Sequence, residues 1–250
     1  MWTSTTGRKA RLNGVCGVTS TWALVAFVYN MDFRGEKSAS FAMPRSVEPR
    51  RFSEHANWLL PGHLLIGRYP YVNPVYCPSE QAGQEQLREL IEAGVTTFVC
   101  LQSELPPQTG GRWPAGGVPV SGFPGAFQPY GALAQGLARD RTLEFLHCPI
   151  ADLDTPGSKE LATLVSELMR RLEDKEVIYL HCWGGRGRSG VVAACLLGSL
   201  QPDLSPEQCL DAVQTGYSSR GSRLDVGALA RSPQTDEQRW FVKQWLGQRK

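Results

Sequence analysis

The sequence of 250 residues lacks the features that mark several common protein classes. It has no Cys-x-x-Cys pair, and its four histidines do not cluster near its seven scattered cysteines, so neither a zinc site nor a disulfide framework is expected. It also lacks an excess of charge of one sign, because 26 Lys and Arg stand against 24 Asp and Glu. That balance argues against a surface that coats nucleic acid, so any preference for anions must come from a local site.

Acidic residues are missing from residues 1–31, which contain three basic residues and seven Ser or Thr. This composition is typical of an organelle transit peptide. The semi-apolar stretch Val15–Tyr29 is interrupted by three hydroxyl residues, so it fits a secretory signal poorly and is too short to span a membrane. We interpret residues 1–50 as an N-terminal extension, either unstructured or targeting, in front of one domain at residues 51–250. The predicted location is the cytoplasm, with a mitochondrion or plastid as the alternative and no stable membrane insertion.

Apolar periodicity predicts strands that alternate with helices through the body of the chain. The expected strands are Leu64–Ile66, Val95–Leu101, Thr142–Ile150 and Val177–Leu180, and the expected helices are Ser79–Ala93, Leu161–Leu172 with Ser158 as its cap, Val191–Leu200, Ser205–Thr215 and Thr235–Leu246. Residues 106–129 are rich in Gly and Pro and are predicted to form a long surface loop. This alternation predicts an α/β fold with a central, mostly parallel sheet flanked by helices.

Residues 180–190 read Leu-His-Cys-Trp-Gly-Gly-Arg-Gly-Arg-Ser-Gly, so that an apolar strand ends at a cysteine and an arginine opens a helix five glycine-rich residues later. The glycines let successive backbone N–H groups turn inward, and the helix N-terminus adds its dipole at the same point. Arg188 offers a forked guanidinium to a tetrahedral oxyanion, and the same field favours the thiolate form of Cys182. The segment predicts a phosphate-binding loop with a nucleophilic thiolate at its floor. The candidate phosphate-binding residues are Trp183, Gly184, Gly185, Arg186, Gly187 and Arg188.

The pattern His-Cys-x-x-Gly-x-x-Arg-Ser, filled by His181, Cys182, Gly185, Arg188 and Ser189, resembles the signature loop of the cysteine-dependent protein tyrosine and dual-specificity phosphatases. The resemblance implies that Cys182 attacks phosphorus and forms a phosphocysteine intermediate, without a metal or other cofactor. Ser189 would hydrogen-bond the Cys182 sulfur. His181 would either fix the loop from behind, with its ring bonded to the backbone, or be an ordinary core histidine.

The resemblance also implies a general acid, which in this family is an aspartate about thirty residues before the cysteine. The family places a proline four residues after that acid, a spacing that Asp152 and Pro156 meet. Asp152 is therefore the predicted acid. Asp154 is the alternative, and its ordinary role would be to form a turn or to start a helix.

A third segment, Ser232–Gln238, resembles the glutamine-containing loop that positions the hydrolytic water in the tyrosine-specific branch. Gln234 is the better candidate by that resemblance, and Gln238 is the second. The alternative is a capped helix start, because Thr-Asp-Glu at residues 235–237 is ordinary first-turn composition.

Two departures from the family bear on the substrate. The acid loop lacks the Trp-Pro-Asp tripeptide of the receptor-like enzymes, which places the chain nearer the small, atypical dual-specificity group. Arg186, inside the loop, is similar to the basic residue of members that act on phosphoinositides, although its side chain could equally point to solvent.

The predicted function is the removal of phosphate from phosphotyrosine proteins, with phosphoserine and phosphothreonine left open. A phosphatase acting on phosphoinositides or other small molecules by the same mechanism is the alternative, and a phosphate-binding module without turnover is a second one. A sulfurtransferase or an arsenate reductase would need neither Asp152, nor Ser189, nor the segment around Gln234. The expected partner is thus a phosphorylated protein or small molecule and not a nucleic acid.

Overall fold

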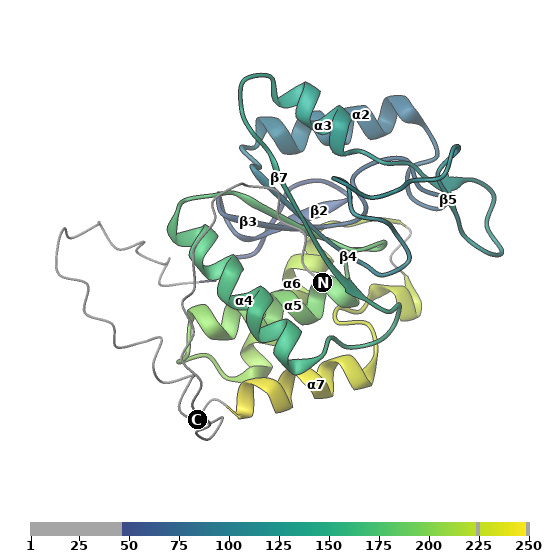
Figure 1. Cartoon of the computed structure of the whole chain (residues 1–250). Coiled ribbons are helices and arrows are strands. Elements are labelled where there is room, and N and C mark those ends of the chain that lie inside the picture. The colour runs from purple at the N-terminus through teal and green to yellow at the C-terminus, as the bar shows by residue number, and fades with distance from the viewer. Residues whose placement is uncertain (1–46, 224–225, 249–250) are drawn as a thin grey trace, which may run out of the picture.

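A six-stranded mixed sheet forms the centre of the computed structural model, which describes residues 47–223 and 226–248 (Figure 1). Across the sheet the strands follow the order β1-β2-β3-β8-β4-β7. They are β1 (Arg50–Arg51), β2 (Ala56–Leu60), β3 (Leu64–Gly67), β4 (Thr97–Gln102), β7 (Glu144–Ile150) and β8 (Ile178–His181). The strands β3, β8, β4 and β7 run parallel, and β1 and β2 extend the sheet in antiparallel fashion. The predicted α/β fold with a mostly parallel sheet is therefore confirmed.

The strand β8 lies between β3 and β4, and its last residue, His181, stands opposite Gly67 and Cys100. All four residues of β8 are buried, as expected for a parallel strand covered on both faces. Its carboxyl end therefore opens at the middle of the sheet edge. This is the edge where open α/β sheets bind their ligands.

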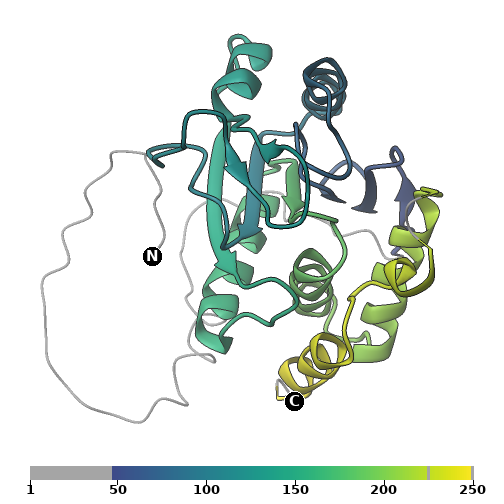
Figure 2. The same ribbon diagram turned by 90° about the vertical axis from the view of Figure 1, so that its right-hand side faces the viewer.

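Helices cover both faces of the sheet (Figures 1 and 2). One face carries α2 (Glu80–Glu92) and α3 (Gly131–Ala138), and the other carries α4 (Ser158–Glu173), α5 (Arg188–Leu200), α6 (Pro206–Ser219) and α7 (Asp236–Gly247). Each face has its own apolar core. The fully buried helix α5 is central to the second one, which explains why its sequence is apolar all round rather than amphipathic.

The predicted helices and strands are found within a few residues of their expected bounds. The strands β1 and β2 were not among the expected strands, and three further differences follow. Ser158 was expected to cap α4, which is wrong, because it is the first helical residue and Gly157 holds the cap position without a side-chain bond. The helix α3 and the short 3₁₀ helix η1 (Gly227–Ala230) were not expected from the sequence. The loop 106–129 contains a two-stranded ribbon, β5 (Val118–Pro119) with β6 (Ala126–Phe127).

The predicted N-terminal extension falls mostly on residues 1–46, which lie outside the described residues. Within the described part, Val47 already packs against the core and β1 begins at Arg50. No helix in the described ranges has the length and apolar character needed to cross a membrane.

Candidate active site

The loop that joins β8 to α5 places Cys182 directly in front of a helix N-terminus. Cys182 is buried at the end of β8, and α5 begins at Arg188 with Gly187 in the cap position. The sulfur of Cys182 lies 3.2 Å from the hydroxyl oxygen of Ser189 in the first turn of α5. The predicted partnership of these two side chains is thus present in the geometry.

The backbone of this loop turns its carbonyl groups away from the loop centre. The carbonyl of Trp183 accepts from the N–H of Tyr69 at 3.0 Å, and that of Arg186 accepts from the hydroxyl of Ser232 at 2.9 Å. None of the N–H groups of residues 183–188 donates to another group among the described residues. Carbonyl groups bonded outside the loop, together with amides that have no partner among the described residues, are the arrangement expected of an anion nest.

Gly185 is the loop position that only glycine fits. Its φ is +67°, and a Cβ atom there would lie 2.3 Å from the backbone of Gly67. The carbonyl of Gly185 accepts from the guanidinium of Arg220 at 2.9 Å, and the same side chain donates to the carbonyl of Ile66 and to Asn57 Oδ1. Arg220, which is buried at the end of α6, therefore pins the loop to β2 and β3, a role that sequence reasoning missed.

Arg188 is 2% exposed and uses both terminal nitrogens. Its Nη1 donates to Glu104 Oε2 at 2.7 Å and to the carbonyl of Ile150 at 3.2 Å. Its Nη2 donates to Glu104 Oε1 at 3.0 Å and lies 3.1 Å from Asp152 Oδ1. Burial works against the charge of Arg188, but the charges of Cys182 and Glu104 outweigh it and raise the pKa, so the guanidinium stays ionised.

Glu104, in the turn after β4, is a second residue that sequence reasoning missed. Burial pushes the pKa of its carboxyl up, but the hydrogen bonds and charge of Arg188 more than compensate and leave it lowered. The forked contact between these two side chains fixes the plane of the guanidinium. No local motif marks Glu104, because it is separated from Arg188 by 84 residues.

The structure separates the two candidate acids. Asp152 lines the same pocket as Cys182 and pairs with Arg188. Asp154 does not line that pocket, and its carboxylate accepts from the backbone N–H of Thr155. This placement favours Asp152 as the acid, as the proline spacing suggests.

The two candidate glutamines also differ in position. Gln234 lines the Cys182 pocket. Gln238 is buried, completes a capping box with Thr235, and donates to the carbonyl of Asp154 at 3.0 Å. Gln238 therefore starts α7 and ties it to the acid loop, whereas Gln234 remains the candidate for a contact with water.

His181 lies beneath the loop, where its Nε2 is 2.7 Å from the hydroxyl of Tyr130. Burial lowers the pKa of His181 to about 3, so its ring is neutral at ordinary pH. The ring is also in contact with those of Tyr69 and Tyr179. These contacts favour a role in supporting the loop over a role in proton transfer.

The Cys182 pocket has a volume of about 270 Å³ and combines aromatic walls with a basic floor. Its walls include Tyr76, Phe123 and Trp183, and the rings of Phe123 and Trp183 meet edge to face at 5.4 Å. Arg186 is 8% exposed, and its Nη1 is buried without a partner among the described residues. The alternative that Arg186 points to solvent is therefore wrong.

The other cysteines of the described chain are buried and are not paired in disulfides. Burial raises the pKa of Cys100 to about 12 and that of Cys148 and Cys209 to about 11. Thiols with such pKa values stay protonated and unreactive at neutral pH. They act as small apolar side chains in the core.

The fold and this site together define a class: an α/β domain with a strand–loop–helix nest beside a buried cysteine, an arrangement suited to a tetrahedral anion. Residues 128–238 match the model of the PTP-SAK family, described as a Swiss Army Knife protein with a DSP-PTPase phosphatase domain.

Curated relatives agree with this match over part of the chain. Human cyclin-dependent kinase inhibitor 3 is 43% identical over 68 residues, which are 27% of this chain and 32% of that protein. Putative tyrosine phosphatase 067L of invertebrate iridescent virus 3 is 34% identical over 107 residues, or 41% and 44% of the two chains. The chain thus spans less than half the length of these relatives.

Solved structures of related shape include the active form of Tk-PTP, with a TM-score of 0.47 and 20% identity over 75% of this chain and 93% of that one. Kinase-associated phosphatase with a serine at its catalytic cysteine gives a TM-score of 0.47 and 21% identity over 74% and 86%. From the family match and the relatives, the chain carries a cysteine-based phosphatase domain of the dual-specificity and tyrosine-phosphatase type.

Proposed function

We propose that this chain removes phosphate from phosphotyrosine in proteins through a phosphocysteine at Cys182. The observation that carries the proposal is that one pocket brings together Cys182, Arg188, Asp152 and Gln234 from three separate segments of the chain. These are a nucleophile, an oxyanion clamp, an acid and a water-facing amide. A phosphate-binding module without turnover would need only the oxyanion-binding group, Arg188.

In the first step the Cys182 thiolate attacks phosphorus, an S–P bond forms, and the bond from phosphorus to the tyrosine oxygen breaks. Asp152 gives its proton to the departing oxygen. Arg188 and the N–H groups of residues 183–188 hold the three equatorial oxygens throughout. Arg188 has two donors for these oxygens. One is Nε–H, which has no partner among the described residues, and the other is the Nη2 hydrogen that now faces Asp152.

In the second step a water attacks phosphorus and gives its proton to Asp152, the S–P bond breaks, and inorganic phosphate leaves. Gln234 is placed to orient that water. Ser189, 3.2 Å from the sulfur, donates a hydrogen bond that stabilises the thiolate as it departs. The covalent intermediate divides one difficult displacement into two easier steps, which is how nucleophilic catalysis usually lowers the barrier.

The walls of the pocket favour an aromatic leaving group. The rings of Tyr76, Phe123 and Trp183 provide faces and edges against which a phenyl ring packs well. Phe123 belongs to the Gly- and Pro-rich loop, residues 106–129. This long loop therefore supplies part of the pocket rim.

A second candidate function is hydrolysis of a small molecule with several phosphates, such as a phosphoinositide. Arg186 favours it, because Arg188 is already paired with Glu104 whereas the guanidinium of Arg186 has no carboxylate partner among the described residues. A second anionic group on the substrate would satisfy it.

The test is hydrolysis of an aryl phosphate across pH by the wild type beside Cys182→Ser and Asp152→Asn, followed by panels of phosphopeptides and phosphoinositides. We expect no turnover by the cysteine variant. For the aspartate variant we expect a lower rate at and below the pH optimum and the loss of the alkaline limb of the profile, because Asp152 can give a proton only while it is protonated. Reduced wild-type protein without vanadate-sensitive hydrolysis would refute the proposal.

A further inference from the structure

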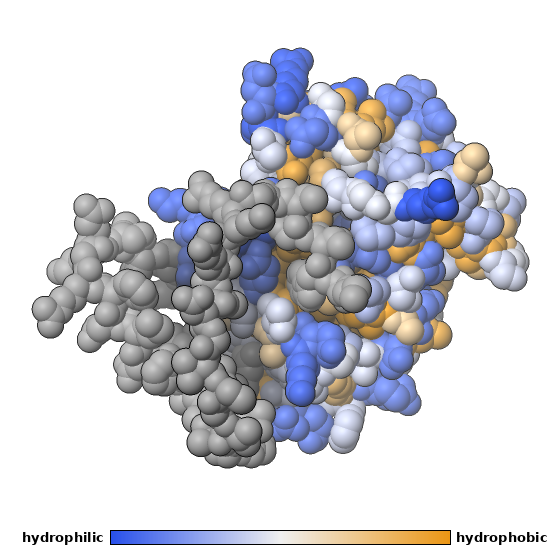
Figure 3. All heavy atoms as spheres, in the orientation of Figure 1, coloured by the Kyte–Doolittle hydropathy of each residue, from blue (hydrophilic) through white to orange (hydrophobic). Residues whose placement is uncertain are grey.

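Four of the five large apolar side chains that the described residues leave exposed line the Cys182 pocket or a second pocket that shares Asp152 with it. The five are Phe123, Leu153, Val226, Leu229 and Trp240. Phe123 and Leu229 line the Cys182 pocket, and Val226 is hydrogen-bonded through its carbonyl to the N–H of Leu229. Figure 3 shows apolar side chains at the surface along the right-hand side of the molecule, the side on which β5 lies. Apolar surface concentrated around one site is typical of an interaction face.

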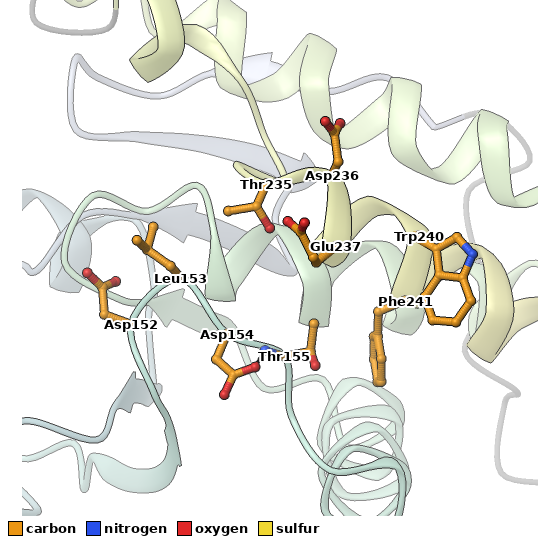
Figure 4. A pocket seen from close by; sticks show the side chains of 9 residues that line it. All are labelled: Asp152, Leu153, Asp154, Thr155, Thr235, Asp236, Glu237, Trp240 and Phe241. Atoms are coloured by element: carbon orange, nitrogen blue, oxygen red, sulfur yellow. Dashed lines mark hydrogen bonds between the residues drawn. The ribbon is translucent and has the colours of Figure 1, made fainter.

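Leu153 and Trp240 line a second pocket, of about 760 Å³, which we call the flanking groove. One wall is the acid loop, residues 152–155, and the other is the start of α7, residues 235–241 (Figure 4). Asp152 lines the flanking groove as well as the Cys182 pocket. A chain bound with its phosphate above Cys182 would therefore continue past Asp152 into this groove.

The two walls are fixed to each other. Gln238 donates from its amide to the carbonyl of Asp154 at 3.0 Å, and its oxygen accepts from the N–H groups of Gln234 and Thr235. Trp240, two residues further along α7, is 63% exposed, and Leu153, at the other end of the groove (Figure 4), is 51% exposed. The groove thus offers a preformed shape with an apolar side chain at each end.

The charge of the groove has one sign. Four carboxylates and no Lys or Arg line it. Asp152 pairs with Arg188, and Asp236 pairs with Arg231. Neither Asp154 nor Glu237 has a cationic partner among the described residues, so the groove keeps a negative charge that a ligand can neutralise. The carboxylate of Asp154 accepts from the N–H of Thr155 and points away from Glu237 (Figure 4).

We propose that the flanking groove binds the residues beside the phosphorylated one in a protein substrate, with apolar side chains against Leu153 and Trp240 at its two ends and a Lys or Arg facing Glu237. This inference rests on the proposed function and narrows its substrate class to phosphoproteins with basic and apolar residues next to the phosphosite. A membrane surface is the poorer occupant, because anionic headgroups would meet Glu237 rather than a cation.

The test compares two phosphotyrosyl peptides that are identical except for Lys or Glu at the positions on either side of the phosphotyrosine. Both peptides are given to the wild type, Glu237→Gln, Glu237→Lys and Trp240→Ala, with a small aryl phosphate as the substrate that is too short to reach the groove. We expect the wild type to prefer the Lys peptide in kcat/KM by about two- to fivefold, the range of a partly exposed ion pair. The preference should shrink in high salt.

Glu237→Gln should abolish this preference, Glu237→Lys should reverse it, and Trp240→Ala should lower kcat/KM for both peptides. All three variants should keep the wild-type rate on the aryl phosphate, which also shows that they fold. If the wild type cleaves the aryl phosphate but treats the two peptides alike, or prefers Glu, the groove proposal is refuted and the proposed function stands. If it cleaves neither the aryl phosphate nor the peptides, the proposed function fails and the groove proposal falls with it.

Discussion

Replacing Glu104 with Gln tests whether the guanidinium of Arg188 must be held by a carboxylate. The substitution keeps the size of the side chain and one acceptor oxygen but removes the charge. In the structure Glu104 takes one hydrogen of each terminal nitrogen of Arg188, at 2.7 and 3.0 Å. The carbonyl of Ile150 and the carboxylate of Asp152 take the others. Without Glu104, half of the contacts that fix the guanidinium plane are weakened.

The expected loss of stability follows from this geometry. Breaking a fully buried ion pair costs about 3–5 kcal/mol, and a hydrogen bond to a charged group contributes about 1.5–3 kcal/mol. Glu104 is 30% exposed, and Asp152 still compensates Arg188, so the lower part of these ranges applies. We expect Glu104→Gln to lower the free energy of unfolding by about 2 kcal/mol, measured by urea denaturation at pH 7.

The expected kinetic effect is a fall in kcat/KM for an aryl phosphate of about 10- to 100-fold, because a displacement of about 1 Å in a positioning group has that cost. Glu85→Gln is the matched control, since it removes the same charge from an exposed ion pair with Arg88 and should change neither quantity measurably. Should Glu104→Gln instead lower KM at unchanged kcat, Glu104 would be a competitor of the substrate phosphate, and the reasoning would be refuted.

Three further outcomes are expected. Burial lowers the pKa of folded-state His181 to about 3 from an ordinary value of 6.5. The neutral ring therefore contributes its full stability above pH 6.5, and the free energy of unfolding decreases as the pH is lowered below 6.5, by up to about 1.4 kcal/mol per pH unit. In urea denaturation between pH 7 and 5, His181→Asn should show a smaller decrease than the wild type. Asp152→Asn should slow substrates with poor leaving groups far more than an activated aryl phosphate, by about 10²-fold or more, and an equal slowing of both would exclude it as the acid. Arg220→Met should lower the free energy of unfolding by about 3 kcal/mol in thermal or urea unfolding, because it leaves the buried carbonyl groups of Gly185 and Ile66 without a hydrogen-bond donor. A change below about 0.5 kcal/mol would contradict the role of Arg220 in holding the loop against the sheet.

The centre of the site could be predicted because its geometry is encoded in contiguous residues. Residues 180–190 specify a buried strand, a turn that needs glycine at Gly185 and a helix start at Arg188, and the structure has all three in that order. The sheet was predictable for a similar reason, since runs of β-branched and apolar residues mark buried parallel strands without reference to any partner.

The supports of the site could not be predicted, because they depend on which segments the topology brings together. Glu104 and Arg220 are ordinary charged residues in turns or at helix ends, and nothing near them in the sequence marks their partners. The helix α3 was missed for a different reason. Its Gly, Ala, Leu and Gln residues give neither a charged first turn nor a strong apolar stripe, and the side chain of its N-cap, Tyr130, makes no capping bond. Tertiary contact, including the bond from Tyr130 to His181, holds this segment in place.

Arg186 in the Cys182 pocket and Glu237 in the flanking groove favour substrates of different charge, which makes the two proposed substrate classes separable by experiment. Arg186 favours more negative charge at the phosphate, whereas the flanking groove with Glu237 favours positive charge a few residues away. A phosphotyrosyl segment with a basic neighbour meets both demands, because its dianionic phosphate faces Arg186 and its cation faces Glu237. A phosphoinositide meets only the first, since any phosphate that extends past Asp152 approaches further carboxylates. Arg186→Leu should therefore weaken the binding of every phosphate ester to Cys182→Ser protein, whereas Glu237→Lys should improve only substrates with a second anionic group. A phosphoinositide that binds the wild type more tightly than the Lys peptide would show that Arg186, rather than the groove, decides the choice of substrate.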